Sequence, residues 1–315
     1  MPLISTEALT KRYPGGVTAL AGLTVEIGEG VIGLVGANGA GKSTLIKILL
    51  GLLPATDGRA TVLDLDTATQ GARIRELVGY MPEHDCLPPD VSATEFVSHM
   101  ARVSGLPSGA ARERTADVLR HVGLYEERYR QIGGYSTGMK QRVKLAQALV
   151  HDPTILFLDE PTNGLDPAGR DEMLGLIERI GRDFGITTIV ASHLLGEIER
   201  IAGWLVAIDA GRLLRTAPLA SFTEQTGQLL VETEDEVAPL AERLVTRGFE
   251  AQATGRLMLV DLDAAPGGDH GVYDAVRDEA VALGLPLVRI EHRRHQLEDL
   301  FRTDPTAGGA DERVA

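Results

Sequence analysis

The sequence predicts an α/β protein built on a mostly parallel, twisted sheet, and three observations support this class. A glycine-rich loop at 36–43 joins an apolar run, 31–35, to a segment whose leucines have helical spacing. A second apolar run, 154–158, ends in the acidic pair Asp159-Glu160. Such runs alternate with helical patterns along the chain, which is typical of parallel sheets covered by helices.

The stretch from Val31 to Leu50 carries the clearest signal. Residues 31–35 have the pattern of a buried parallel strand, and 44–50 have that of a helix. Between them, GANGAGKS fits G-x-x-x-x-G-K-[ST]. In that setting successive backbone N–H groups and the helix dipole converge on one anion. Lys42 would reach the β- and γ-phosphates and the Ser43 hydroxyl would ligate Mg²⁺, so we infer a nucleoside triphosphate site.

The remaining elements place this loop in a domain spanning residues 1–217. Residues 3–30 predict short strands separated by glycine turns. A helical insertion is expected at about 84–134, with one helix capped by Ser92 or Thr94 and a second over 108–121. The other expected strands are 60–63, 78–81, 154–158, 186–190 and 204–208, and the other expected helices are 139–150 and 173–184.

The pattern changes after about residue 213, which predicts a small second domain over 218–302. Residues 218–227 are expected to connect the two domains. The segments that follow have the order βαββαβ, which suggests a ferredoxin-like α+β domain. The tail, 303–315, is rich in Thr, Pro, Gly and Ala, and we expect it to be disordered.

Composition narrows the possible partners. The 315 residues include 31 Lys and Arg and 45 Asp and Glu, which gives a formal net charge of -14. This negative charge is unfavourable for binding the phosphate backbone of nucleic acid. The single cysteine, Cys86, excludes an internal disulfide and favours a reducing compartment. The start of the chain lacks the pattern of a signal peptide, and the longest apolar stretch, 45–53, is too short to cross a bilayer. We therefore expect a cytoplasmic protein.

Asp159 and Glu160 would have different tasks at the end of their strand. A carboxylate there can hold Mg²⁺ opposite Ser43. The adjacent Glu160 can orient and deprotonate the water that attacks the γ-phosphate. An exposed acidic pair is the alternative, since the chain has 45 acids, but the hydrophobic strand before the pair favours the catalytic interpretation.

Taken together, these motifs resemble the ATP-binding subunit of ATP-binding cassette (ABC) transporters over residues 1–220. Residues 80–83 stand where that family has its Q-loop, and 135–142 resemble its signature sequence. Residues 155–160 match the Walker B strand and 164–166 the D-loop. His193 falls at the switch histidine and Tyr13 at the adenine-stacking aromatic, although by spacing alone Tyr13 fits a surface aromatic better and a lone histidine is more often structural.

The resemblance implies a set of site residues. Catalytic roles fall to Glu160 and His193, and Mg²⁺ binding to Ser43, Asp159 and Glu83. The residues expected to bind ATP in one copy or across a dimer are Tyr13, Gly36, Asn38, Gly39, Ala40, Gly41, Lys42, Ser43, Thr44, Ser136, Gly138 and Asp166.

It also implies partners. Two cassettes would pair head to tail, as a homodimer or with a paired cassette, holding ATP between the phosphate loop of one copy and Ser136 to Gly138 of the other. ATP hydrolysis by the two cassettes would drive an integral membrane permease, so the resemblance places the protein at the cytoplasmic side of the membrane. Glu83 replaces the glutamine that is usual in the family, so the family's metal contact at this position does not carry over directly. Thr137 and Met139 differ from the residues that are common in the family's signature sequence. These signature departures resemble cassettes that serve export.

A different class remains open from the sequence. A soluble ABC ATPase without a transport role would act on ribosomes or DNA. Such proteins usually carry tandem cassettes or long coiled coils, neither of which this chain shows, and the acidic charge also counts against a nucleic-acid partner.

Overall fold

A computed structural model describes residues 2–223, 225–262 and 268–294. The described chain divides into two compact units, with the boundary after Leu219. The expected boundary lay at 217/218. The predicted tail, 303–315, lies outside the described residues, as does the end of the expected second domain, 295–302.

The first unit is built on a six-stranded sheet of order β10-β9-β3-β8-β7-β6. Its strands are β3 (Val31–Val35), β6 (Val78–Met81), β7 (Ile155–Asp159), β8 (Thr187–Ser192), β9 (Trp204–Asp209) and β10 (Arg212–Pro218). All neighbours run parallel except β9 and β10, which pair antiparallel at the edge. The predicted α/β class with a mostly parallel sheet is therefore confirmed.

A second, antiparallel sheet of order β2-β1-β4-β5 accompanies it. Its strands are β1 (Ile4–Arg12), β2 (Thr18–Ile27), β4 (Asp57–Val62) and β5 (Leu65–Asp66). The short strands expected before residue 30 are in fact two strands of nine and ten residues that pair with each other. Their length reflects register shifts along β1, which let the pair bend without ending.

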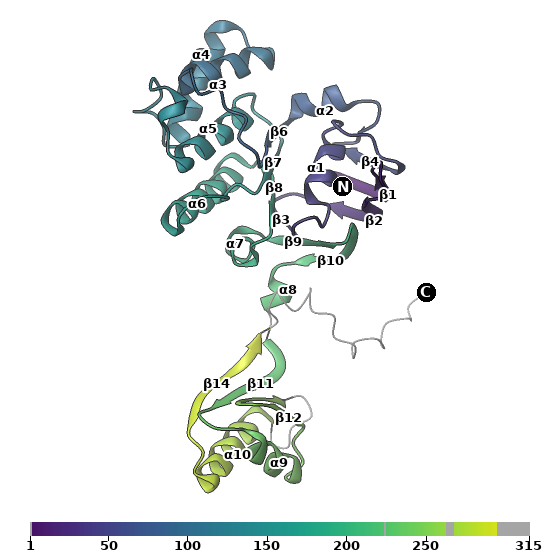
Figure 1. Cartoon of the computed structure of the whole chain (residues 1–315), viewed down its shortest axis with the longest axis vertical. Coiled ribbons are helices and arrows are strands. Elements are labelled where there is room, and N and C mark those ends of the chain that lie inside the picture. Colours follow the sequence, from purple (N-terminus) through teal and green to yellow (C-terminus); the bar gives the residue numbers. More distant parts are fainter. Residues whose placement is uncertain (1, 224, 263–267, 295–315) are drawn as a thin grey trace. The chain divides into compact units, whose positions relative to one another are not determined.

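The helices of the first unit lie beside these two sheets (Figure 1). They are α1 (Lys42–Leu49), α2 (Gly71–Leu77), α3 (Ala93–Val103), α4 (Ser108–His121), α5 (Thr137–Leu149), α6 (Pro167–Phe184) and α7 (Leu195–Ile201), with a 3₁₀ turn at Ile132–Gly134. Between β6 and α5 lie α3 and α4, which pack on each other and on α5 and form the predicted helical insertion. Ser92 caps α3 through a capping box with Glu95, which decides between Ser92 and Thr94.

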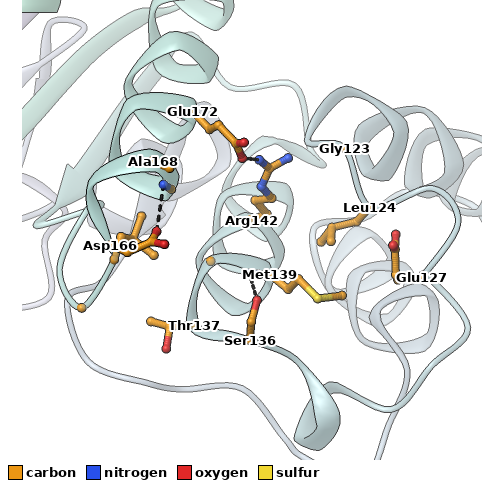
Figure 2. Close-up of a pocket in the computed structure, with 14 residues that line it drawn as sticks. Gly123, Leu124, Glu127, Ser136, Thr137, Met139, Arg142, Asp166, Ala168 and Glu172 are labelled. Atoms are coloured by element: carbon orange, nitrogen blue, oxygen red, sulfur yellow. Dashed lines mark hydrogen bonds and ion pairs between the residues drawn. The ribbon is translucent and has the colours of Figure 1, made fainter.

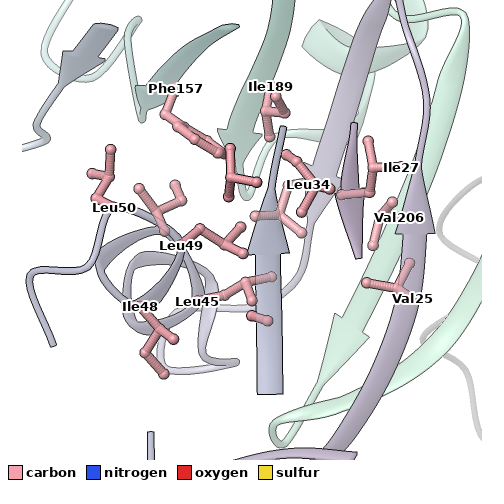
Figure 3. Close-up of a cluster of buried hydrophobic side chains, with 14 of the residues drawn as sticks. Val25, Ile27, Leu34, Leu45, Ile48, Leu49, Leu50, Phe157, Ile189 and Val206 are labelled. Atoms are coloured by element: carbon pink, nitrogen blue, oxygen red, sulfur yellow. The ribbon is translucent and has the colours of Figure 1, made fainter. Parts of the chain in front are cut away.

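The core of the first unit lies around α1, between the two sheets. Leu45 and Leu49 of α1 pack with Leu34 of β3 and Phe157 of β7, while Val25 comes from the antiparallel sheet (Figure 3). Phe157 and Leu49 are at most 1% exposed. Burying large apolar side chains contributes about 1.5–3 kcal/mol each, so the helix that follows the phosphate loop is held firmly at its C-terminal end.

The second unit begins at Ala220. Its elements are α8 (Ala220–Thr223), β11 (Gln225–Thr233), α9 (Ala238–Thr246), β12 (Ala251–Thr254), β13 (Leu257–Asp261), α10 (Gly268–Leu283) and β14 (Leu287–Arg294). From β11 onward the order is βαββαβ, and the strands form one antiparallel sheet of order β12-β13-β11-β14. This is the ferredoxin-like element order predicted from the sequence.

The prediction that residues 218–227 form a connector between the domains is wrong. Pro218 ends β10, residues 220–223 form α8, and β11 already begins at Gln225. Strand β10 accepts Pro218 because it lies at the edge of its sheet, where the missing N–H leaves no neighbouring strand unpaired. Among the described helices, none is long and apolar enough to cross a membrane.

Candidate nucleotide site

The phosphate loop lies between β3 and α1, as the sequence predicts. Gly41 stands at the N-cap of α1 with a left-handed φ of 108°. A Cβ at Gly41 would come within 2.4 Å of the Ala19 carbonyl oxygen, so only glycine allows the loop to close here. The result is a helix start whose free N–H groups face the loop, a common arrangement for binding phosphate.

Lys42 folds back over this loop. Its Nζ donates to the Gly36 carbonyl oxygen at 2.7 Å and lies 3.5 Å from Glu160 Oε1. Both charged side chains are nearly buried, at 6% and 7% exposed. A buried lysine held by carbonyl oxygens and one carboxylate is a cation already desolvated and aimed at the loop, as phosphate binding requires.

Ser43 and Asp159 come together across the sheet edge. Ser43 Oγ donates to Asp159 Oδ1 at 3.2 Å. Burial raises the pKa of Asp159, and the carboxylates of Glu83 and Glu160 raise it further, while the Ser43 hydrogen bond lowers it. A hydroxyl and a carboxylate side by side are hard oxygen donors of the kind that Mg²⁺ takes together with water and phosphate oxygens.

Glu160 occupies an unusual backbone conformation. Its φ of 51° is left-handed, which costs a non-glycine residue of order 1–3 kcal/mol. Its N–H donates to the Ala191 carbonyl oxygen at 2.9 Å, which fixes this turn to β8. From there the carboxylate reaches Lys42 with one oxygen, while the other lies 2.9 Å from His193 Nδ1. The turn therefore sends the side chain into the loop rather than along the strand.

Glu83 lines the same cavity of about 310 Å³ as the phosphate loop and Glu160. Asn163 Nδ2 donates to Glu83 Oε1 at 3.5 Å, and Lys144 Nζ donates to the Glu83 carbonyl oxygen at 3.0 Å. Lys144 is 3% exposed, and burial lowers its pKa. Lys144 was not predicted from the sequence, because a lysine in a helix is ordinarily exposed.

Tyr13 lies beside the start of α1. Its hydroxyl is 3.4 Å from Thr44 Oγ1, and the Lys11 ammonium lies 5.4 Å from the centre of its ring. Asn38, Gly39 and Ala40 line the loop cavity together with Thr44. The ring is thus next to the phosphate loop, where a nucleotide base could stack on it.

The signature residues form a separate, open pocket (Figure 2). Ser136 caps α5 by accepting from the Met139 N–H at 3.3 Å, and Asp166 caps α6 by accepting from the Gly169 N–H at 2.9 Å. Two helix N-termini therefore border one cavity of about 640 Å³, which Gly138 also lines. This cavity shares no residue with the phosphate-loop cavity, so the chain does not itself bring Ser136 and Gly138 to Lys42.

The fold and the loop define a class first. P-loop nucleoside triphosphatases have a parallel sheet in which a glycine-rich loop leads into a helix N-terminus. They also have a lysine that reaches the phosphates from this loop and a Ser–Asp pair near the ends of the strands. This chain has all of these features.

The comparisons narrow this class to a family. A family profile described as "ABC transporter" matches residues 20–163. The linearmycin resistance ATP-binding protein LnrL of Bacillus subtilis is 30% identical, over 95% of this chain and 97% of its own length. The Nod factor export ATP-binding protein I of Ralstonia nicotianae is 31% identical over 95% and 92%, and the methionine import ATP-binding protein MetN of Caulobacter vibrioides is 30% identical over 86% and 86%.

Among solved structures, CbiO1 of Clostridium perfringens, part of the ABC transporter complex CbiONQ, has a TM-score of 0.64. It is 29% identical and covers 70% of this chain and 90% of its own. The chain belongs to the family of ABC transporter ATP-binding proteins. It is an ATPase subunit of a transporter, as the motifs of its phosphate loop and signature imply.

Proposed function

We propose that this chain dimerises around ATP and Mg²⁺ and drives export of a substrate through a separate membrane permease, at the cytoplasmic face of the membrane. The observation that supports this most directly is the division of the site into two halves. Lys42, Ser43 and Glu160 stand assembled in one cavity, and Ser136 and Gly138 border another. A second copy turned head to tail would bring its signature to the first copy's phosphate loop.

Within such a dimer the residues have distinct tasks. Lys42 binds the β- and γ-phosphates, replacing the carbonyl and carboxylate contacts that it makes here. Glu160 accepts a proton from the attacking water, and His193 holds the Glu160 carboxylate in place from the side away from Lys42. Ser136 and the N-terminus of α5 face the γ-phosphate.

The donor set fits Mg²⁺. Ser43 and Asp159 supply a hydroxyl and a carboxylate 3.2 Å apart, and Glu83 lines the phosphate-loop cavity together with Ser43. When bound, the cation supplies charge neutralisation between the phosphates. Among the described residues no three His, Cys, Asp or Glu side chains form a group that could hold a metal ion.

Export is the finer part of the proposal. Its support is the signature with Thr137 and Met139, together with a relative named for Nod factor export. A relative of similar identity is named for import, so direction needs its own test. We would reconstitute the chain, together with the membrane protein that co-purifies with it, in inside-out vesicles. Export predicts ATP-driven accumulation of substrate inside such vesicles; accumulation only in right-side-out vesicles loaded with ATP would reverse the direction.

The dimer is tested with Glu160→Gln. The amide keeps the shape of the side chain but cannot take a proton, so turnover should stop while ATP still binds. Size-exclusion chromatography with light scattering should then show a dimer with ATP and Mg²⁺, and a monomer with ADP. Glu178→Gln, at an exposed glutamate of α6, should retain turnover. A Glu160→Gln chain that binds ATP yet stays monomeric would refute the two-copy site.

The soluble alternative is tested by its partners. Native protein purified in mild detergent should carry an integral membrane protein. Recovery with ribosomes or DNA, and with no membrane protein, would favour the alternative that we set aside.

A further inference from the structure

Glu197 of α7 is a buried carboxylate without a role in the reaction described above. It is 5% exposed, and three groups from three different segments meet it. One oxygen, Oε2, accepts from Thr162 Oγ1 at 2.7 Å and from Ser192 Oγ at 3.0 Å. The other, Oε1, lies 3.3 Å from Arg170 Nε.

These segments are the ones that carry the reacting side chains. Thr162 lies two residues after Glu160, and Ser192 ends β8 immediately before His193. Both residues are buried, with Thr162 2% exposed and Ser192 0% exposed. A single carboxylate oxygen therefore joins the turn of Glu160 to the turn of His193, whose side chains approach to 2.9 Å.

Ser192 transmits this constraint through the backbone. While its hydroxyl hydrogen points to Glu197, its oxygen accepts from the Leu194 N–H at 3.0 Å. This bond closes a short turn around His193. Without an acceptor at Glu197, the Ser192 hydroxyl could rotate, and the turn around His193 would lose its fixed shape.

The Arg170 contact explains why a carboxylate suits this position. Arg170 Nε and Glu197 Oε1 approach closely, but neither atom makes a hydrogen bond of good geometry among the described residues. The guanidinium therefore acts as a nearby charge rather than as a directional partner. A glutamine could still accept from both hydroxyls, but its NH₂ group would face the guanidinium with donor against donor.

We propose that Glu197 is a positioning residue, which clamps Thr162 to Ser192 and thereby fixes His193 against Glu160. The inference rests on the proposed roles of Glu160 and His193. Misplacing a reacting group by about 1 Å can cost about 10²-fold in rate. Glu197 does not line the phosphate-loop cavity, so the loss should fall on kcat and leave the KM for ATP unchanged.

The first experiment measures steady-state ATP hydrolysis of Glu197→Ala and Glu197→Gln. We expect kcat to fall about ten- to a hundred-fold for alanine, and less for glutamine, because it keeps the acceptor for the two hydroxyls. The control is Glu178→Ala, which removes a glutamate that pairs with an arginine on the surface of α6. A parallel rise in KM would indicate general damage and would overturn the assignment.

A double-mutant cycle separates positioning from folding. If Glu197 acts through His193, then Glu197→Ala should cost little further activity in a His193→Ala background. A merely structural glutamate would give losses that multiply. Because alanine could impair folding, Thr162→Val and Thr162→Ser provide a milder pair, in which valine should lower kcat and serine should restore it.

Glu160→Gln in the same assay tells the two hypotheses apart. If that variant retains turnover, the proposed function of the site is wrong. If it abolishes turnover while Glu197→Ala and Thr162→Val keep the wild-type kcat, the site stands and only the positioning role of Glu197 is overturned.

Discussion

The phosphate-loop cavity and the signature cavity, the two halves of the proposed site, differ in how completely their side chains are already paired. In the phosphate-loop half, Lys42 and Glu160 are both at most 7% exposed and already contact each other. In the signature half, Ser136 and Gly138 border an open cavity of about 640 Å³, and Ser136 accepts a hydrogen bond from the Met139 N–H of its own helix, α5. The phosphate-loop half is preassembled. The signature half exposes Ser136 and Gly138, which do not line the phosphate-loop cavity of their own chain.

This contrast has a physical origin. A buried lysine must be paired, because leaving a charge without a partner in the interior is costly. The phosphate-loop half therefore closes on itself, and ATP must exchange one set of contacts for another. A helix N-terminus at the surface is hydrated and needs no such partner. The signature half can thus remain exposed, as the proposed binding of a second copy's phosphate requires.

The strongest way to test the preassembled half is Lys42→Ala. It removes the cation that faces the phosphates and leaves Glu160 buried beside an empty space, so hydrolysis should fall by at least about 10²–10³-fold. Nucleotide affinity should fall as well, measured by fluorescence titration with a labelled ATP. Lys47→Ala, at an exposed lysine of the same helix, should retain both. A Lys42→Ala chain with near-normal turnover would contradict the reading of this cavity as the catalytic one.

The exposed half is tested with Ser136→Asp. Aspartate still caps α5, so stability should be kept, while its charge would repel the γ-phosphate and hydrolysis should fall by about tenfold or more. ATP binding to a single chain should be unchanged. Ser136→Ala serves as the contrast, because it loses the cap and should destabilise α5 by about 0.5–2 kcal/mol.

Mixing these two inactive variants tests the comparison directly. A dimer of one Lys42→Ala chain and one Ser136→Asp chain contains one composite site with an intact phosphate loop and an intact signature. An equal mixture should then recover up to about a quarter of wild-type turnover, since half of the dimers are mixed and each has one good site of two. If the mixture stays inactive while both variants still dimerise, the halves do not meet across copies.

The sequence predicts features whose residues are close together in the chain better than contacts between residues that are far apart in it. The phosphate loop is contiguous, and its strand was predicted with the bounds that the structure has, Val31–Val35. Helix α4 likewise begins and ends where expected, at Ser108 and His121. In both cases periodicity and turn residues within one short stretch hold all the information.

Elements without a local signal were missed or misjudged. Helices α2 and α7 have seven residues each, and neither has a side-chain N-cap. The pairing of β1 with β4 joins Ile4 to Val62, which no local pattern reveals. The meeting of Glu160 with His193 could be expected only from the family resemblance, and the clamp at Glu197 not even so, because a glutamate on a short amphipathic helix is ordinarily an exposed one.

The smallest expected effect concerns stability rather than turnover, and it shows that preassembly has a cost. Burial raises the pKa of Asp159 above 3.8. The folded chain therefore holds this proton more tightly than the unfolded chain, and stability falls as pH rises through the interval between the two pKa values.

Replacing Asp159 with asparagine removes the buried charge but keeps an acceptor for Ser43, so nucleotide-free Asp159→Asn should melt about 2–4 °C higher at neutral pH. The gain should shrink as the pH falls through this interval and disappear below 3.8, where the carboxyl of Asp159 is neutral in both states. Calorimetry at several pH values checks this against Asp117→Asn, an exposed position on α4. A melting temperature that drops, or a gain independent of pH, would mean that the Ser43 bond outweighs burial and that this half of the site is not held under electrostatic strain.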